Sequence, residues 1–241
     1  MEKYHDLEKE ENFSIIDGNK GNRKEAKVID FHEKKKEKLE DYLNYLINPH
    51  EIFKIGESFF EDYENGIQHF GLATTGSLKC KQRVLLELAN FFHRQNSQLK
   101  IAIPTLSLAT GIYSNLLSDC KRSEKILTAS SSITEINFCG QFDFLSLGEI
   151  LDQREGKVGK DWKNFWDRAL FDYDVVLWDI PSIHEFRDSL HNLDPLLSSL
   201  ENVSIIVEHQ VSSIRDVDRV KNFFIGHGID IKGLLFDPVK I

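Results

Sequence analysis

The chain has 241 residues, a hydrophobic content of 41% and a formal net charge of −9 at neutral pH. This length and composition favour one sizeable domain with an N-terminal appendage. The acidic balance argues against a nucleic-acid binder, because phosphate backbones are held by clustered Lys and Arg side chains. We therefore expect small ligands and other proteins as partners, and no nucleic acid.

The cysteines do not indicate a disulfide framework or a zinc site. Cys80, Cys120 and Cys139 are odd in number and lack CxxC spacing, so we expect three buried thiols in a reducing compartment. The first residues are charged where a signal peptide would be apolar, and no run approaches the roughly 20 apolar residues of a membrane span. The sequence therefore predicts a cytoplasmic protein.

Residues 1–50 are predicted to form a charged arm followed by a helix, and residues 51–241 the folded domain. In the helix, apolar residues recur at helical spacing until Asn48-Pro49 ends it. The lysines at 34–36 raise the alternative of a peripheral position at the inner face of the cell membrane. Interleaved acidic residues favour a solvated helix face instead.

Strands and helices alternate through the rest of the chain. This order calls for right-handed β-α-β crossovers and a mostly parallel sheet with helices on both faces, which is an α/β fold. The predicted strands are residues 69–74, 100–103, 125–128, 142–147, 173–179, 203–207 and 231–236. The predicted helices are residues 52–65, 84–92, 109–117, 161–170, 186–200 and 213–224, with an interrupted helix from residue 148.

Residues 68–92 are predicted to form strand, turn and helix, the unit in which nucleotide phosphates bind at a helix N-terminus. A phosphate loop GxxxxGK[ST] needs glycines around the phosphates, a Lys for their oxygens and a hydroxyl for Mg²⁺. With Lys81 at the Lys position, Thr75 and Cys80 replace the glycines and Gln82 replaces the hydroxyl residue. The candidate nucleotide-contacting residues of this loop are Gly76, Ser77, Lys79, Lys81 and Gln82.

Two charged residues, one in this loop and one at the end of a later strand, have competing interpretations. Lys81 contacts an anion at the helix start, or it is a solvent-exposed side chain of a first helical turn. Asp179 ends the apolar strand 173–179 and is the candidate metal ligand. At the sheet edge its carboxylate would hold Mg²⁺ or a water molecule. Its alternative role is to cap the turn beside Pro181.

The order of elements resembles a known family. Residues 171–181, FDYDVVLWDIP, are similar to the Walker B-type strand, usually YDxVIIDTPP, of bacterial tyrosine kinases of the CpsD/CapB type and their MinD/ParA-like relatives. Residues 228–237, GIDIKGLLFD, resemble the family's GINVVGVVLN ending, and residues 56–63, GESFFEDY, its EAFRELRTN helix. The resemblance covers most of the chain after residue 50 and implies a P-loop NTPase-like fold.

The resemblance also implies ligands and partners. ATP or ADP with Mg²⁺ would be the cofactor, and Asp237 stands at the base-contacting Asn position, although a plain strand-end Asp is the alternative. The setting would be exopolysaccharide biosynthesis and export. A membrane polysaccharide copolymerase, an active kinase homologue or a homo-oligomer would then be the partner.

The departures from the family pattern favour a protein without kinase activity. The family's second acidic motif, IDADLR, is replaced by residues 103–108, IPTLSL, which contain no acid. One well-placed electrostatic group is worth roughly 10²- to 10³-fold in rate, and phosphoryl transfer depends on such groups. The leading hypothesis is a non-catalytic or weakly active kinase-like protein that acts through protein contacts.

Two other hypotheses stay open. One is an active nucleotide-binding ATPase or kinase of the MinD/ParA-like class, with an atypical loop in which Lys79 or Lys81 and Asp179 suffice. The other is a scaffold whose pocket at the sheet edge is filled by its own side chains.

Overall fold

The computed structural model describes residues 49–106, 108–118, 120–128, 131–147, 167–182, 197, 200 and 202–237. The predicted arm and the helix that follows it, within residues 1–48, lie outside the described residues. So do the interrupted helix after residue 148 and most of the predicted helices 161–170 and 186–200.

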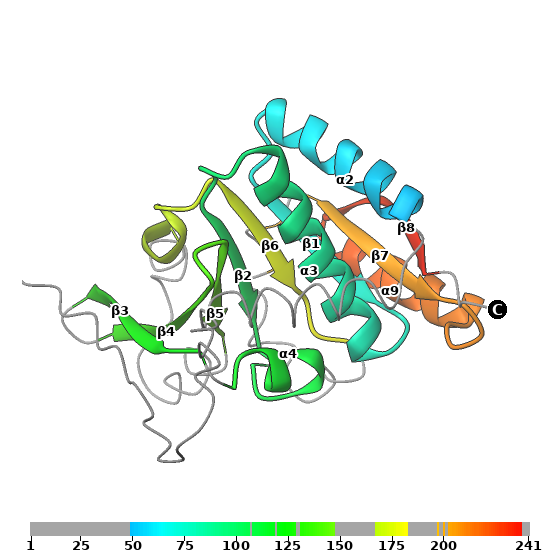
Figure 1. Ribbon diagram of the computed structural model, residues 1–241. Helices are drawn as coiled ribbons and strands as arrows, with labels where there is room; N and C mark the ends of the chain where they lie inside the picture. Colours follow the sequence, from blue (N-terminus) through cyan, green and yellow to red (C-terminus); the bar gives the residue numbers. More distant parts are fainter. Residues whose placement is uncertain are drawn as a thin grey trace, which may run out of the picture.

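The described strands form one sheet in the order β3-β4-β5-β2-β6-β1-β7-β8 (Figure 1). The six strands from β5 to β8 run parallel, while β4 pairs antiparallel with both β3 and β5. The strands are β1 (His69–Thr74), β2 (Ile101–Thr105), β3 (Arg122–Thr128), β4 (Ser131–Phe138), β5 (Phe142–Ser146), β6 (Val175–Asp179), β7 (Asn202–Glu208) and β8 (Asp230–Asp237). The predicted α/β fold with a mostly parallel sheet is confirmed.

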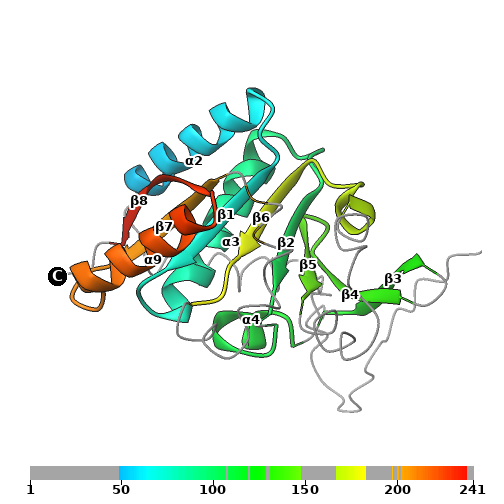
Figure 2. The same cartoon turned by 180° about the vertical axis from the view of Figure 1, so that it is seen from behind.

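Helices cover both faces of this sheet. The helices α2 (Pro49–Glu64), α3 (Leu78–Gln95) and α4 (Gly111–Leu116) lie on one side, and α9 (Ile214–Gly226) lies on the other (Figures 1 and 2). None of the helices in the described ranges is both long enough and apolar enough to form a transmembrane span.

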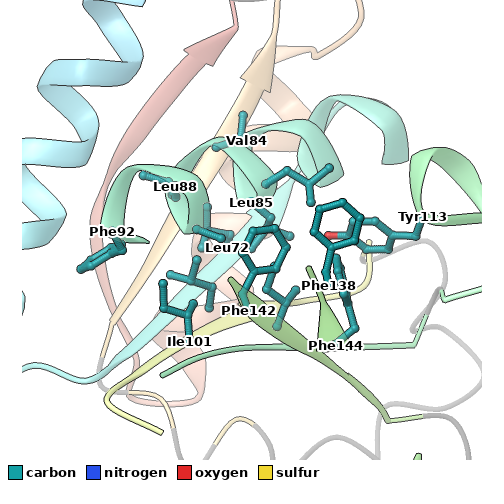
Figure 3. Close-up of a cluster of buried hydrophobic side chains, with 14 of the residues drawn as sticks. Leu72, Val84, Leu85, Leu88, Phe92, Ile101, Tyr113, Phe138, Phe142 and Phe144 are labelled. Carbon is teal, nitrogen blue, oxygen red and sulfur yellow. The ribbon is translucent and has the colours of Figure 1, made fainter. Parts of the chain in front are cut away.

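The apolar core is divided between the two faces. Under α3, side chains from the sheet and the helix pack together, among them Leu72, Leu85 and Phe92 (Figure 3). Under α9, the core includes Trp178, Ile205 and Phe224. Burial of each large apolar side chain stabilises the folded state by about 1.5–3 kcal/mol. The two layers together therefore fix the helices against the sheet.

The prediction missed β4, because its Ser-rich start was interpreted as a connection. The loop after it contains Cys139 and Gly140 with φ values of 53° and 70°, which makes a tight turn into β5. Such consecutive positive φ values are typical of hairpins. In the sequence only Gly140 hinted at this turn, because Cys, unlike Asn or Asp, does not favour a positive φ.

Two smaller predictions are wrong. Strand β2 does not end before Pro104 but continues to Thr105, with Pro104 opposite Leu145 of β5. Proline lacks an N–H, so the sheet loses a donor there, but the strand keeps its direction. Of the three cysteines, only Cys80 is buried, and Cys120 and Cys139 are half-buried.

Candidate functional site

The candidate site lies at the carboxyl edge of the parallel strands, where the chain leaves β1 for α3. The parallel registers align Leu72 with Asp179 of β6, and Thr74 with Ile206 of β7. Thr105, the last residue of β2, is aligned with Asp179. Residues distant in sequence therefore meet around the loop 75–77, because parallel strands end at the same edge.

Lys81 and Asp179 form a buried ion pair at this edge. The Lys81 Nζ lies 2.6 Å from Asp179 Oδ1, and the two side chains are 2% and 1% exposed. Lys81 Nζ also donates a hydrogen bond to the backbone carbonyl of Ile180, and Thr105 Oγ1 donates to Asp179 Oδ2 at 2.6 Å. Buried charges of this kind are stable only when paired. Lys81 is thus not the solvent-exposed side chain of the alternative interpretation.

Tyr113 of α4 places a phenol close to this pair. Its hydroxyl is buried and has no hydrogen-bond partner among the described residues. Burial, and secondly the negative charge of Asp179, raise the pKa of Tyr113 well above its ordinary value. In Figure 3 Tyr113 lies at one end of the apolar cluster, its hydroxyl is directed inward toward the other side chains, and its ring is next to Phe144.

The backbone of the loop is bonded to a carboxylate of the same chain. The Ser77 N–H donates to Glu208 Oε2 at 2.6 Å, and the Ser77 hydroxyl caps α3 by accepting from the Cys80 N–H at 3.2 Å. A Cβ at Gly76 would meet the Glu208 side chain at 2.5 Å, so glycine allows this contact. Glu208 therefore places its negative charge at the N-terminus of α3, where a helix attracts anions.

The turn after β7 is fastened to the same loop. The Thr75 hydroxyl donates to Ser212 Oγ at 2.7 Å, and the Glu208 N–H donates to the same Ser212 oxygen at 2.9 Å. Gln210 in this turn has a φ of 62°, which is uncommon for a residue with a side chain. These bonds fix residues 208–212 against residues 75–77.

Solved structures with a similar fold come from bacterial kinases. The kinase domain of the Escherichia coli tyrosine kinase ETK has a TM-score of 0.51 and 18% identity over 75% of this chain and 71% of that one. The kinase domain of VpsO has a TM-score of 0.53 and 14% identity over 87% and 100% of the two chains. The chain has the fold of bacterial tyrosine-kinase domains.

A further structure supports the tyrosine-kinase fold. The chimeric protein CapA2B2 has a TM-score of 0.56 and 14% identity, over 85% of this chain and 99% of that one. No protein-family model and no curated protein matches the chain. The predicted likeness to bacterial tyrosine kinases is confirmed at the level of structure, and at these identities the similarity concerns the fold alone.

Gln82, which the motif comparison places at the position of a Mg²⁺ hydroxyl residue, holds the start of α4 in the structure. Its Oε1 accepts from the Ile112 N–H at 2.7 Å, and its Nε2 donates to the Thr110 carbonyl at 3.2 Å. Gly111 has a φ of 63°, and a Cβ there would lie 2.1 Å from Gln82 Oε1. The amide of Gln82 therefore connects α3 to α4.

The two remaining predicted contact residues lie at the same edge but apart from the ion pair. Lys79 is exposed in the first turn of α3. Asp237 ends β8, opposite Glu208 in the register of β7 and β8. The structure thus brings all the predicted site residues to one edge of the sheet, and their roles toward a nucleotide or a metal stay predictions.

The arrangement does not fit ATP with Mg²⁺. Lys81 is occupied by Asp179, and the Glu208 carboxylate lies at the loop N–H that a phosphate would need. Sequence reasoning missed Thr105, Tyr113 and Glu208, whose proximity to the loop depends on strand register and on the packing of α4 rather than on a motif.

Proposed function

We propose that this protein is a non-catalytic or weakly active member of the tyrosine-kinase fold that acts through protein contacts. The observation that carries the proposal is internal pairing at the place of the phosphate loop. Lys81 is bonded to Asp179, the Ser77 N–H to Glu208, and the Gln82 amide to the start of α4. A triphosphate has to compete with all three sets of contacts.

The energetic scale supports this proposal. Separating a buried ion pair typically costs about 3–5 kcal/mol when one charge is left without a partner. At about 1.4 kcal/mol per factor of ten, that cost alone lowers a nucleotide's affinity by roughly 10²- to 4 × 10³-fold. The Glu208 carboxylate adds repulsion against any phosphate at the start of α3. Tight binding therefore requires a rearranged site.

The biological setting we propose is the regulation or assembly of exopolysaccharide biosynthesis and export. The partner would be a membrane polysaccharide copolymerase or an active kinase homologue, which places the protein at the cytoplasmic face of the membrane. The kinase fold and the ordered sequence resemblance support this setting. The acidic net charge of −9 is consistent with protein rather than nucleic-acid contacts.

The direct test is isothermal titration with ATP and Mg²⁺, combined with a measurement of phosphate release. We expect no binding tighter than about 100 μM, equivalent to roughly −5.5 kcal/mol, and phosphate release that is absent or very slow. Binding below that value together with turnover would reject the proposal.

One observation favours a second candidate, an ATPase or kinase with an atypical loop. Lys81 and Asp179 are in contact at the sheet edge, and Lys79, two residues before Lys81 in the first turn of α3, is exposed to solvent and so open to an anion. If the wild-type protein hydrolyses ATP, Lys81→Ala and Asp179→Ala should abolish the activity. Full activity in both variants would rule this candidate out.

A further inference from the structure

The helix α3 is buried even on the side that faces away from the sheet. Its Leu85, Leu88 and Phe92 side chains pack with strand residues in the core (Figure 3). At 3.6 residues per turn, Arg83 and Asn90 lie on the opposite side of the helix. Each of them is nevertheless only 8% exposed. Polar side chains on the outer side of a flanking helix are ordinarily solvated, so this burial indicates a further layer of protein over α3.

The helices α2 and α4 flank this outer side of α3 (Figure 1). The centre of the Phe53 ring of α2 lies 5.6 Å from that of Phe91, and Gln82 holds the start of α4. Gln82 and Phe91 are half a turn apart around the axis of α3, and each is about a quarter turn from Asn90. Arg83 and Asn90 therefore lie on a stripe between the two flanking helices.

Apolar surface adjoins this stripe. Phe53 is 48% exposed despite its contact with Phe91. Leu86, about one helical turn from both Arg83 and Asn90, is completely buried. The aliphatic stem of Arg83 adds further apolar surface. A segment that covers the stripe must therefore present apolar side chains toward α3.

The segment directly before α2 has the required pattern. Its apolar residues recur at the i, i+3, i+4, i+7 spacing of one helix face: Leu39, Tyr42, Leu43 and Leu46. The described chain begins at Pro49, the first residue of α2. A connection of only a few residues places consecutive helices side by side.

The lengths agree as well. A helix of residues 38–47 extends about 15 Å, at 1.5 Å per residue. The stripe from Arg83 to Asn90 extends about 10 Å along α3 on the same scale. The segment can therefore cover the stripe while its end stays joined to α2.

We propose that residues 38–47 form a helix that packs on the outer side of α3, over the stripe of Arg83 and Asn90 and beside Phe53. The short connection to α2 gives this segment a high effective concentration, so it is favoured over a second copy of the chain or a helix of another protein. The charged arm that precedes it then leaves the molecule on the α3 side of the sheet. This inference is independent of the function proposed for the loop 75–82.

The test is amide hydrogen exchange of the full chain, followed by mass spectrometry of peptides that cover residues 38–47. We expect exchange at least about tenfold slower than in an unstructured peptide of the same sequence, because a helix of this length is marginal in water and gains protection only from packing. The double variant Leu43→Asp/Leu46→Asp places two carboxylates on the apolar side and should remove the protection. Asn44→Asp adds a carboxylate to the opposite side, so this matched control should retain it.

A substitution on the domain side keeps the test decisive if the double variant fails to fold. Phe53→Asp removes apolar surface at a half-exposed position and should speed the exchange of residues 38–47 by at least about threefold. Ile126→Asp, 78% exposed on the edge strand β3, is its control and should have no effect.

Four results would each overturn the proposal. They are exchange of residues 38–47 at the unstructured rate in the wild-type chain, protection that survives in a folded double variant, and protection that Phe53→Asp leaves unchanged. The fourth is protection that disappears on dilution, since that result would assign the cover to a second copy of the chain.

Discussion

The ammonium group of Lys81 lies 2.6 Å from a carboxylate oxygen of Asp179, with both side chains almost completely buried. One residue belongs to the first turns of α3 and the other to the end of β6, so the pair fastens a helix to the central strand of the sheet. Thr105 supplies the third member from β2. The pair thereby joins α3, β6 and β2 beside the loop that the sequence predicted to contact phosphate.

Breaking the pair from one side should destabilise the protein strongly. Asp179→Ala leaves the Lys81 ammonium buried without its counter-ion, and we expect a loss of about 3–5 kcal/mol in the free energy of unfolding. Urea denaturation followed by circular dichroism measures it. The double variant Lys81→Met/Asp179→Leu removes both charges and should recover most of the loss. A double variant as unstable as Asp179→Ala would contradict a role for the unpaired charge.

The sequence predicted the strands better than it predicted the contacts between them. The run Val175–Asp179 is apolar throughout and ends in a carboxylate, which identified a central parallel strand and its edge. The partners of Asp179 were not predictable in the same way. Thr105 meets it through the register of β2 and β6, and Tyr113 through the packing of α4. Neither of these two contacts produces a periodic pattern in the sequence.

The contacts of the loop 75–82, which was predicted to bind phosphate, were likewise not predictable from the sequence. The motif comparison indicated that Gln82 is not a Mg²⁺ hydroxyl residue, but not that its amide would hold the start of α4. It also gave no sign of Glu208, because a carboxylate at the end of a strand is ordinary in sequence. Its contact with the Ser77 N–H exists only because β1 and β7 are neighbours in the sheet.

Removing the charge of Glu208 should loosen the loop. Glu208→Gln keeps the side-chain length but exchanges a charge-assisted hydrogen bond for a neutral one and removes a negative charge from the start of α3. We expect a loss of about 1 kcal/mol in the free energy of unfolding, and faster amide exchange at Ser77. Glu57→Gln, on the exposed surface of α2, is the control and should change neither quantity.

Gly111 should tolerate no side chain. Gly111→Ala combines a φ of 63° with a Cβ 2.1 Å from Gln82 Oε1, and we expect a loss of at least about 2 kcal/mol in thermal or urea denaturation. Gly140→Ala is the matched control, because its φ is 70° but a Cβ there meets nothing within 4 Å. It should cost only about 1 kcal/mol. Equal losses in the two variants would show that the Gln82 contact is unimportant.

Stability should fall as the pH rises through the weakly acidic range. Burial raises the pKa of Glu87 from 4.5 to about 7, against the opposing charges of Arg94 and Arg83. Between these two values the folded state binds more protons than the unfolded state, so raising the pH favours unfolding. Because Glu87 is partly exposed to solvent, we expect about 1–2 kcal/mol between pH 5 and pH 8, measured by urea denaturation. Glu87→Gln should remove this dependence, and Glu57→Gln should retain it.

Tyr113 offers the opposite case, in which deletion of a polar group should stabilise the protein. Its hydroxyl is buried near Asp179 without a hydrogen-bond partner among the described residues, so its desolvation is not compensated. Tyr113→Phe keeps the ring contact with Phe144 and should raise the free energy of unfolding by up to about 1 kcal/mol. Tyr173→Phe is the contrasting control, because the Tyr173 hydroxyl donates to Glu135, and its removal should lower stability by a similar amount. If Tyr113→Phe were destabilising instead, the hydroxyl would have a partner, and the buried pair of Lys81 and Asp179 would be the first place to look for it.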